Sequence, residues 1–134
     1  MKKFVFVFAL GLSLILSACG AAKPTTTITV SLTDFQFQPA KFVIPAGKEI
    51  TLNATNTGAV VHNFVIMKAG TTAGEIFDDE DLPNVYWEVE INPGGEAHVT
   101  FTAPSDPGDY QLVCRTKGHL AAGMTGTITV VADE

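Results

Sequence analysis

Three side chains that bind soft metal ions lie in one short segment, CRTKGHLAAGM. Cys114, His119 and Met124 supply a thiolate, an imidazole and a thioether, and four residues separate each from the next. A fourth candidate, His62, stands far upstream at the start of an apolar run. Together they match the trigonal His₂Cys site with a weak axial methionine that binds copper. Zinc also accepts cysteine and histidine, but a neutral methionine is a poor fourth ligand for it.

Each of these residues also has an ordinary interpretation when taken alone. His62 could be a buried histidine, Met124 could fill the core, and His119 after Gly118 could belong to a turn. Cys114 could be an inert buried thiol. Their conjunction favours the metal site, because the ordinary account needs four independent coincidences.

The N-terminus has the features of an export signal. Residues 1–18 read MKKFVFVFALGLSLILSA, two lysines before an apolar run that is too short for a transmembrane helix. The stretch 16–19 (LSAC) resembles the bacterial lipobox, which implies a lipid on Cys19 and a location at the outer face of the cell membrane or in the periplasm. Residues 19–27 then form a flexible leash. The alternative is an ordinary signal peptide with a cysteine near its end.

The cysteine count makes Cys114 informative. The chain has two cysteines, so a lipid on Cys19 leaves Cys114 without a disulfide partner. In an oxidising compartment, such a thiol is either buried and inert or bound to something.

The charge balance narrows the range of partners. The formal net charge is −6, and without Lys2 and Lys3 six basic residues face fourteen acidic ones, a net charge of −8. An acidic surface repels nucleic acid and anionic lipid headgroups, so we expect no nucleic-acid partner. The densest acidic cluster, residues 78–81, reads as a solvated loop.

The remaining sequence predicts an all-β fold. Short β-branched and aromatic runs recur between turn signals, as in a Greek-key β-sandwich of about eight strands. The expected strands are ITVSL, KFVI, KEITLNAT, VHNFVIM, NVYWEVEI, EAHVTFT, GDYQLVC and TGTITVV. Residues 69–83 lack alternation and predict a long loop or a short helix. We expect one domain over residues 28–134.

Alternation in these strands indicates which side chains face the core. In GDYQLVC the inward set is Tyr110, Leu112 and Cys114, so the thiol lies at the inner end of its strand. In EAHVTFT the inward set contains Ala97, and His98 therefore faces solvent. His98 is thus excluded from the metal site.

The joint motif resembles the small cupredoxins, the family of plastocyanin, azurin, auracyanin and rusticyanin. CRTKGHLAAGMTGTITV looks like their C-terminal signature, and its loop spacing is nearest to that of auracyanin and rusticyanin. FQPAKFVIPAGKEITLNATNTGAVVHNFVI resembles the family's early strands, and the likeness spans residues 28–131. One departure is Lys117, where many relatives have proline; with Arg115 it places two positive charges beside the site.

The resemblance implies one copper ion that alternates between Cu(I) and Cu(II). His62, Cys114 and His119 would be its equatorial ligands and Met124 the axial one. Asn63 would tie the two ligand segments together through a bond from its backbone N–H to the Cys114 sulfur. The backbone carbonyl of Val61 would approach the opposite axial side.

The function implied is that of a type 1 (blue) copper protein carrying single electrons between redox proteins, not that of an enzyme. We expect a monomer whose partners dock transiently on the His119 face. The predicted docking residues are Leu120, Ala121, Ala122 and Gly123. The alternative is a copper-binding or delivery protein without a role in electron transfer.

Overall fold

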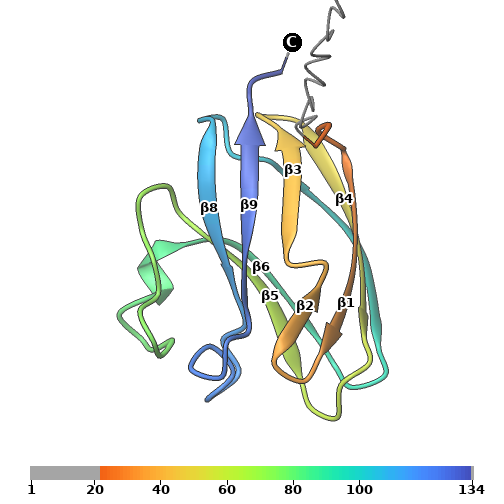
Figure 1. Cartoon of the computed structure of the whole chain (residues 1–134), viewed down its shortest axis with the longest axis vertical. Coiled ribbons are helices and arrows are strands. Elements are labelled where there is room, and N and C mark those ends of the chain that lie inside the picture. Colours follow the sequence, from red (N-terminus) through yellow and green to blue (C-terminus); the bar gives the residue numbers. More distant parts are fainter. Residues whose placement is uncertain (1–21, 134) are drawn as a thin grey trace, which may run out of the picture.

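The computed structural model describes residues 22–133, which form two facing β-sheets (Figure 1). The strands are β1 (Thr27–Thr33), β2 (Gln36–Gln38), β3 (Lys41–Pro45), β4 (Glu49–Asn56), β5 (His62–Met67), β6 (Val85–Ile91), β7 (Glu96–Thr102), β8 (Gly108–Val113) and β9 (Thr125–Val131). A short 3₁₀ helix, η1 (Leu82–Asn84), precedes β6. No helix in this part of the chain is long and apolar enough to cross a membrane.

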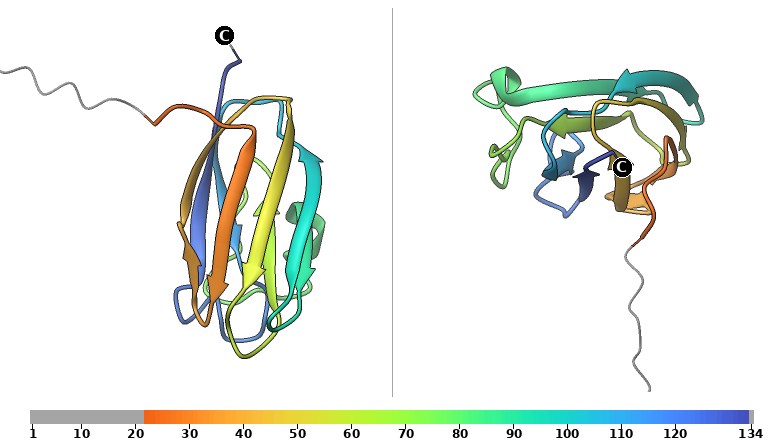
Figure 2. Two further views of the ribbon diagram at one scale, coloured as in Figure 1. Left: turned by 90° about the vertical axis from the view of Figure 1, so that its right-hand side faces the viewer. Right: turned by 90° about the horizontal axis from the view of Figure 1, so that it is seen from above.

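The two sheets stack as a sandwich. One sheet has the order β2-β1-β4-β7 and the other β3-β9-β8-β5-β6. Pairing is antiparallel except for β1 with β4 and β3 with β9, which are parallel. Figures 1 and 2 show the C-terminus at one end of the sandwich and, at the other, the loops before β5 and β9 and the β1–β2 turn. Three connections that are distant in sequence thus meet at one end.

The core fills the space between the sheets. In β4 every second residue is buried, which is the pattern of a strand with one face against the core. The strand β5 differs, because all six of its residues are buried. A second apolar cluster covers its outer face and explains this burial. That cluster comprises Val65, Met67, Ala73, Val113 and Leu120.

The sequence predicted this architecture with small differences. The all-β sandwich is confirmed, but residues 22–133 form nine strands where about eight were expected. The additional strand, β2, is only three residues long, too short to leave a recognisable alternation. The predicted irregular stretch 69–83 is a loop that ends in η1.

The N-terminal predictions lie mostly outside the described residues. The signal peptide 1–18 and Cys19 fall wholly there. Within the predicted leash 19–27, the backbone N–H of Thr25 already bonds the carbonyl of Val43 at 3.0 Å, and β1 starts at Thr27. The folded part therefore begins slightly before residue 28.

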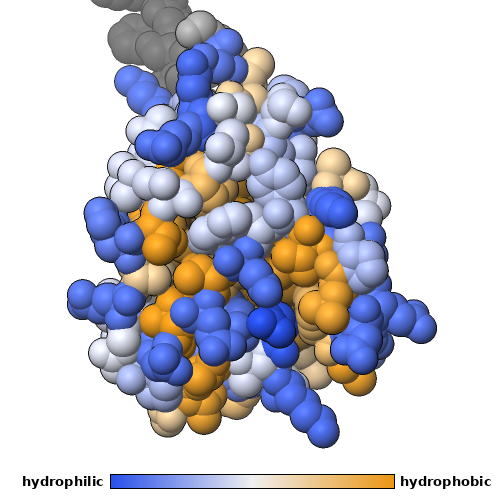
Figure 3. Space-filling model, turned by 180° about the vertical axis from the view of Figure 1, so that it is seen from behind, coloured by the Kyte–Doolittle hydropathy of each residue, from blue (hydrophilic) through white to orange (hydrophobic). Residues whose placement is uncertain are grey.

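The surface opposite to the view of Figure 1 is mixed in polarity. Figure 3 shows separate hydrophobic patches between hydrophilic side chains, rather than one continuous apolar face. Over residues 22–133, the exposed large hydrophobic residues include Phe35 and Val60. Both belong to turns at the end of the sandwich where the candidate ligands lie.

Candidate metal centre

Three of the predicted ligands converge at that end of the sandwich. One ligand atom from each of His62, Cys114 and His119 lies within 4.8 Å of the other two. The Cys114 sulfur is 3.8 Å from His62 Nδ1 and 3.6 Å from His119 Nδ1. All three residues are buried, as is Met124.

These distances fit a metal ion bound between the three atoms. Nitrogen and sulfur ligands lie about 2.0–2.3 Å from such an ion, so a trigonal set has edges of roughly 3.5–3.9 Å. The two sulfur-to-nitrogen distances are of this size. With Met124, the residues form the arrangement of a type 1 copper site, as the sequence predicted.

The strand β5 supplies His62. Its backbone is fixed in register on both sides, because β5 pairs with β6 and β8. The buried Asn56 shapes the turn that enters β5: its side-chain amide donates to the carbonyls of Val60 and Ile91, each at 2.8 Å. Its oxygen accepts the backbone N–H of Gly58 at 2.9 Å. These bonds fix the turn before His62.

The loop between β8 and β9 supplies the other ligands and is closed by its own backbone. The N–H of Met124 donates to the carbonyl of His119 at 2.9 Å, and the N–H of Cys114 donates to the carbonyl of Met124 at 3.2 Å. Gly118 and Gly123 turn the chain with φ of 84° and 98°, a region that favours glycine. The three ligands are therefore held in position without a metal ion.

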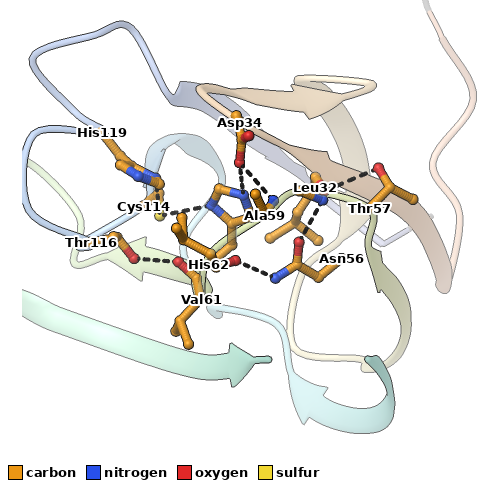
Figure 4. A network of polar contacts seen from close by, with 12 residues as sticks. Leu32, Asp34, Asn56, Thr57, Ala59, Val61, His62, Cys114, Thr116 and His119 are labelled. Carbon is orange, nitrogen blue, oxygen red and sulfur yellow. Dashed lines mark hydrogen bonds and ion pairs between the residues drawn. The ribbon is translucent and has the colours of Figure 1, made fainter. Parts of the chain in front are cut away.

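Asn63 and Thr116 join the strand to the loop. The backbone N–H of Asn63 lies 3.4 Å from the Cys114 sulfur, the contact that the resemblance implied. The Thr116 hydroxyl lies 2.7 Å from the carbonyl of Val61 (Figure 4). It also lies 3.1 Å from the side-chain oxygen of Asn63. The Val61 carbonyl thus already accepts a bond from Thr116, and its approach to the axial side stays a prediction.

His119 is more enclosed than expected. The predicted docking of partners on the His119 face requires an exposed ring edge, but the exposed fraction of His119 is only 6%. Phe35 covers it, in an edge-to-face contact with 5.2 Å between ring centroids. Burial lowers the pKa of His119 below its usual value of 6.5; His62 lowers it further and Asp34 opposes both. These influences together favour the neutral imidazole, the form that binds a metal ion.

The predicted docking residues do not all face outward. Ala121, Ala122 and Gly123 are exposed, but Leu120 is buried in the cluster on the outer face of β5. The leucine side chain is large enough to gain more from burial than from exposure, and it fixes the base of the loop. Leu120 is thus a structural residue, and the exposed Phe35 joins the surface beside His119 in its place.

The charges near the site differ from the prediction in one respect. Arg115 Nε lies 2.8 Å from Glu88 Oε2, in an ion pair without the angle of a regular hydrogen bond. The positive charge of Arg115 is therefore compensated, whereas Lys117 is exposed. His98 lies on the outer face of β7 beside Asn53, outside the site as predicted.

Sequence reasoning missed four residues around the ligands, namely Asp34, Phe35, Asn56 and Thr116. The stretch 33–36 (TDFQ) has no glycine or proline to mark its turn. Phe35 has a φ of 67°, the only positive value among the non-glycine residues of 22–133. A strained residue of this kind often lies at a functional site, but its backbone angle is invisible in the sequence.

Comparison with known proteins gives the site its context. Auracyanin-B of Chloroflexus aurantiacus is 33% identical over 110 residues, which are 70% of this chain and 46% of that protein. The chain thus spans less than half the length of this relative. The copper-resistant cuproprotein CopI of Rubrivivax gelatinosus is 29% identical over 120 residues, 82% of this chain and 69% of that protein.

Solved structures and a family model agree with these relatives. The structure of reduced auracyanin from Roseiflexus castenholzii superposes with a TM-score of 0.68 at 30% identity, covering 81% of this chain and 99% of that one. The model of the cupredoxin-like domain matches residues 6–130. With a two-sheet fold and a buried His₂Cys set beside a methionine, the chain belongs to the cupredoxin family and binds one copper ion.

Proposed function

We propose that this protein carries single electrons between redox proteins outside the cytoplasm, tethered to a membrane by a lipid on Cys19. When bound, copper supplies the one-electron Cu(I)/Cu(II) couple. His62, Cys114, His119 and Met124 would hold the ion. The likeness to auracyanin supports this assignment.

The observation that carries the proposal is the enclosure of the ligand set. His62, His119 and Cys114 are all buried. Backbone hydrogen bonds close the loop that holds Cys114 and His119. Electron exchange is favoured when ligands scarcely move between oxidation states, as in this arrangement. A substrate would need an open position beside the metal, so the enclosure favours a carrier over an enzyme.

The surface beside His119 is where we propose that partners dock. Phe35, with 47% of its surface exposed, and the small residues Ala121, Ala122 and Gly123 leave a low, mostly apolar surface over the ligand. A partner can approach such a surface closely and leave quickly, as a transient redox contact requires. We expect the protein to act as a monomer.

A spectroscopic titration tests the proposal. The metal-free protein titrated with Cu(II) should develop an intense visible Cys-to-copper band at one equivalent, and a small reductant should bleach it reversibly. Cys114→Ser should bind copper without that band. A colourless wild-type complex would contradict the electron carrier and favour the alternative function.

The alternative is copper binding or delivery, which the likeness to a copper-resistant cuproprotein supports. A delivery protein must release its ion, so transfer of Cu(I) to a competing chelator separates the two functions. The buried ligands lead us to expect slow release, over hours rather than seconds. Release within seconds, with no reversible colour change, would favour delivery.

The tether is tested separately from the copper site. If Cys19 carries a lipid, the expressed full chain should fractionate with membranes, and its N-terminal peptide should have the mass of an acylated cysteine. Cys19→Ser should move the protein to the soluble extracytoplasmic fraction. An unmodified Cys19 would contradict the tether and leave the copper chemistry unaffected.

A further inference from the structure

The β1–β2 turn brings a carboxylate to the back of the strand ligand. Asp34 Oδ1 lies 3.3 Å from Nε2 of His62, the ring nitrogen that faces away from Cys114. Figure 4 shows the two side chains pointing toward one another from different elements. Asp34 belongs to the four-stranded sheet's end, whereas His62 begins a strand of the other sheet.

The His62 ring needs an acceptor at this position. When Nδ1 binds a metal, a neutral imidazole carries its proton on Nε2, which becomes a donor. His62 is fully buried, and its Nε2 has no regular hydrogen bond to any residue of 22–133. The Asp34 carboxylate is the acceptor within reach, so a small rotation would complete the bond.

The surrounding turn holds the carboxylate in place. The same oxygen of Asp34 accepts the backbone N–H of Ala59 at 3.1 Å, which ties the β1–β2 turn to the turn before β5. Gly58 lies against this contact, and a Cβ at that position would overlap both His62 Nε2 and Asp34 Oδ1. A glycine here is what allows carboxylate and imidazole to meet.

We propose that Asp34 is a positioning residue for the copper site. It fixes His62 in the tautomer that carries its proton on Nε2, so that the unprotonated Nδ1 faces Cys114. Its negative charge, and the stronger donation it induces in the imidazole, both stabilise Cu(II) relative to Cu(I). Asp34 therefore holds the reduction potential below the value that the ligands would otherwise set. This inference rests on the copper site of the proposed function but requires no electron partner.

The metal-free protein provides the first test. Long-range ¹H–¹⁵N NMR, at a pH where its histidines are neutral, should show His62 with its proton on Nε2 only. Asp34→Ala should give a mixture of tautomers, because no other residue of 22–133 accepts a hydrogen bond from His62 Nε2. Gly58→Ala should give the same mixture with the carboxylate still present, because the added methyl group separates the pair.

The copper-loaded protein provides the second test. Asp34→Asn keeps the shape and an acceptor oxygen but loses the charge, so its reduction potential should shift upward with the visible band retained. Asp34→Ala should lower copper affinity about 10- to 100-fold, the usual cost of removing such a support. Asp106→Asn removes one negative charge in the β7–β8 loop, which precedes Gly108 and its partner Val130 at the other end of the sandwich, and should change neither quantity.

The outcomes that overturn the proposal are equally specific. A single Nε2–H tautomer in metal-free Asp34→Ala, or an unchanged potential in Asp34→Asn, excludes the positioning role. A shift of equal size in Asp106→Asn also excludes it, because the effect would then be one of net charge. If Asp34→Ala does not fold, the isosteric Asp34→Asn variant still decides. A visible band that survives in these variants keeps the proposed function separate from this result.

Discussion

The two imidazoles of the site are held in opposite ways. His62 begins a strand that is buried on both faces and paired on both sides, and it has no exposed surface. His119 lies in a loop that is closed by its own backbone bonds, near the surface and beneath one exposed ring. One ligand belongs to the scaffold, and the other belongs to the surface that we propose for partner docking.

This difference separates the part of the site that fixes its geometry from the part that lies near the surface. The strand ligand takes its position from the core, which is densely packed and resists displacement. The loop ligand takes its position from local turns and contacts the surface through Phe35. Substitutions in the strand should therefore change mainly stability, and substitutions in the loop should change mainly the proposed electron exchange.

The largest effect, a loss of unfolding free energy, is expected from a cavity in the strand β5. Phe64, two residues after His62, is fully buried between Phe37 and Phe42, with ring centroids 5.8 and 6.1 Å away. Phe64→Ala should lower the free energy of unfolding by about 3–5 kcal/mol through lost burial and a cavity. Chemical denaturation of the metal-free protein measures this.

A half-buried residue of the other sheet gives the control for Phe64. Val99→Ala in β7 removes fewer buried atoms and should cost about 1 kcal/mol or less. An equal loss of unfolding free energy in the two variants would contradict the view that β5 contributes most to the stability of the site.

A smaller effect is expected where strand and loop are joined. Thr116→Val keeps the side-chain volume but removes the hydroxyl that bonds Val61 and Asn63. The stability of the metal-free protein should fall by about 1–2 kcal/mol, and copper should leave faster because the loop is less firmly attached. Thr100→Val, on the exposed face of β7, is the matched control and should change neither. Unchanged copper release in Thr116→Val would show that loop and strand hold their ligands independently.

The sequence was sufficient for the fold and for the ligands themselves. Alternation placed Cys114 inward and His98 outward, because side chains in a strand alternate with period two whatever the rest of the fold does. The ligand motif was recognisable because soft-metal side chains are few in this chain, with three histidines and two cysteines.

The supporting residues could not be predicted in the same way. Asp34 reaches His62 only because the β1–β2 turn of one sheet lies beside the β4–β5 turn, a proximity set by how the sheets stack. Leu120 was assigned to the surface because a small-residue loop gives no periodicity, and only the packed structure shows that it faces inward. Contacts between turns depend on how the sheets stack, so the sequence does not reveal them. The metal ligands can be recognised from the sequence because few side-chain types bind soft metal ions.

The smallest effect is expected for the β8–β9 loop, where a substitution should change the rate of electron self-exchange but not the free energy of unfolding. Ala122 is exposed close to His119, so Ala122→Glu should alter the unfolding free energy by less than about 0.5 kcal/mol. If two copies exchange electrons through this face, the two new carboxylates oppose each other at about 1 kcal/mol in water, slowing self-exchange roughly fivefold. NMR line broadening of mixed Cu(I) and Cu(II) protein measures that rate, and added salt should restore most of it.

Ser105→Glu makes the same charge change in the β7–β8 loop at the far end of the sandwich. Because the chain is already acidic, a general repulsion would slow both variants alike, and that result would remove electron exchange from the His119 face.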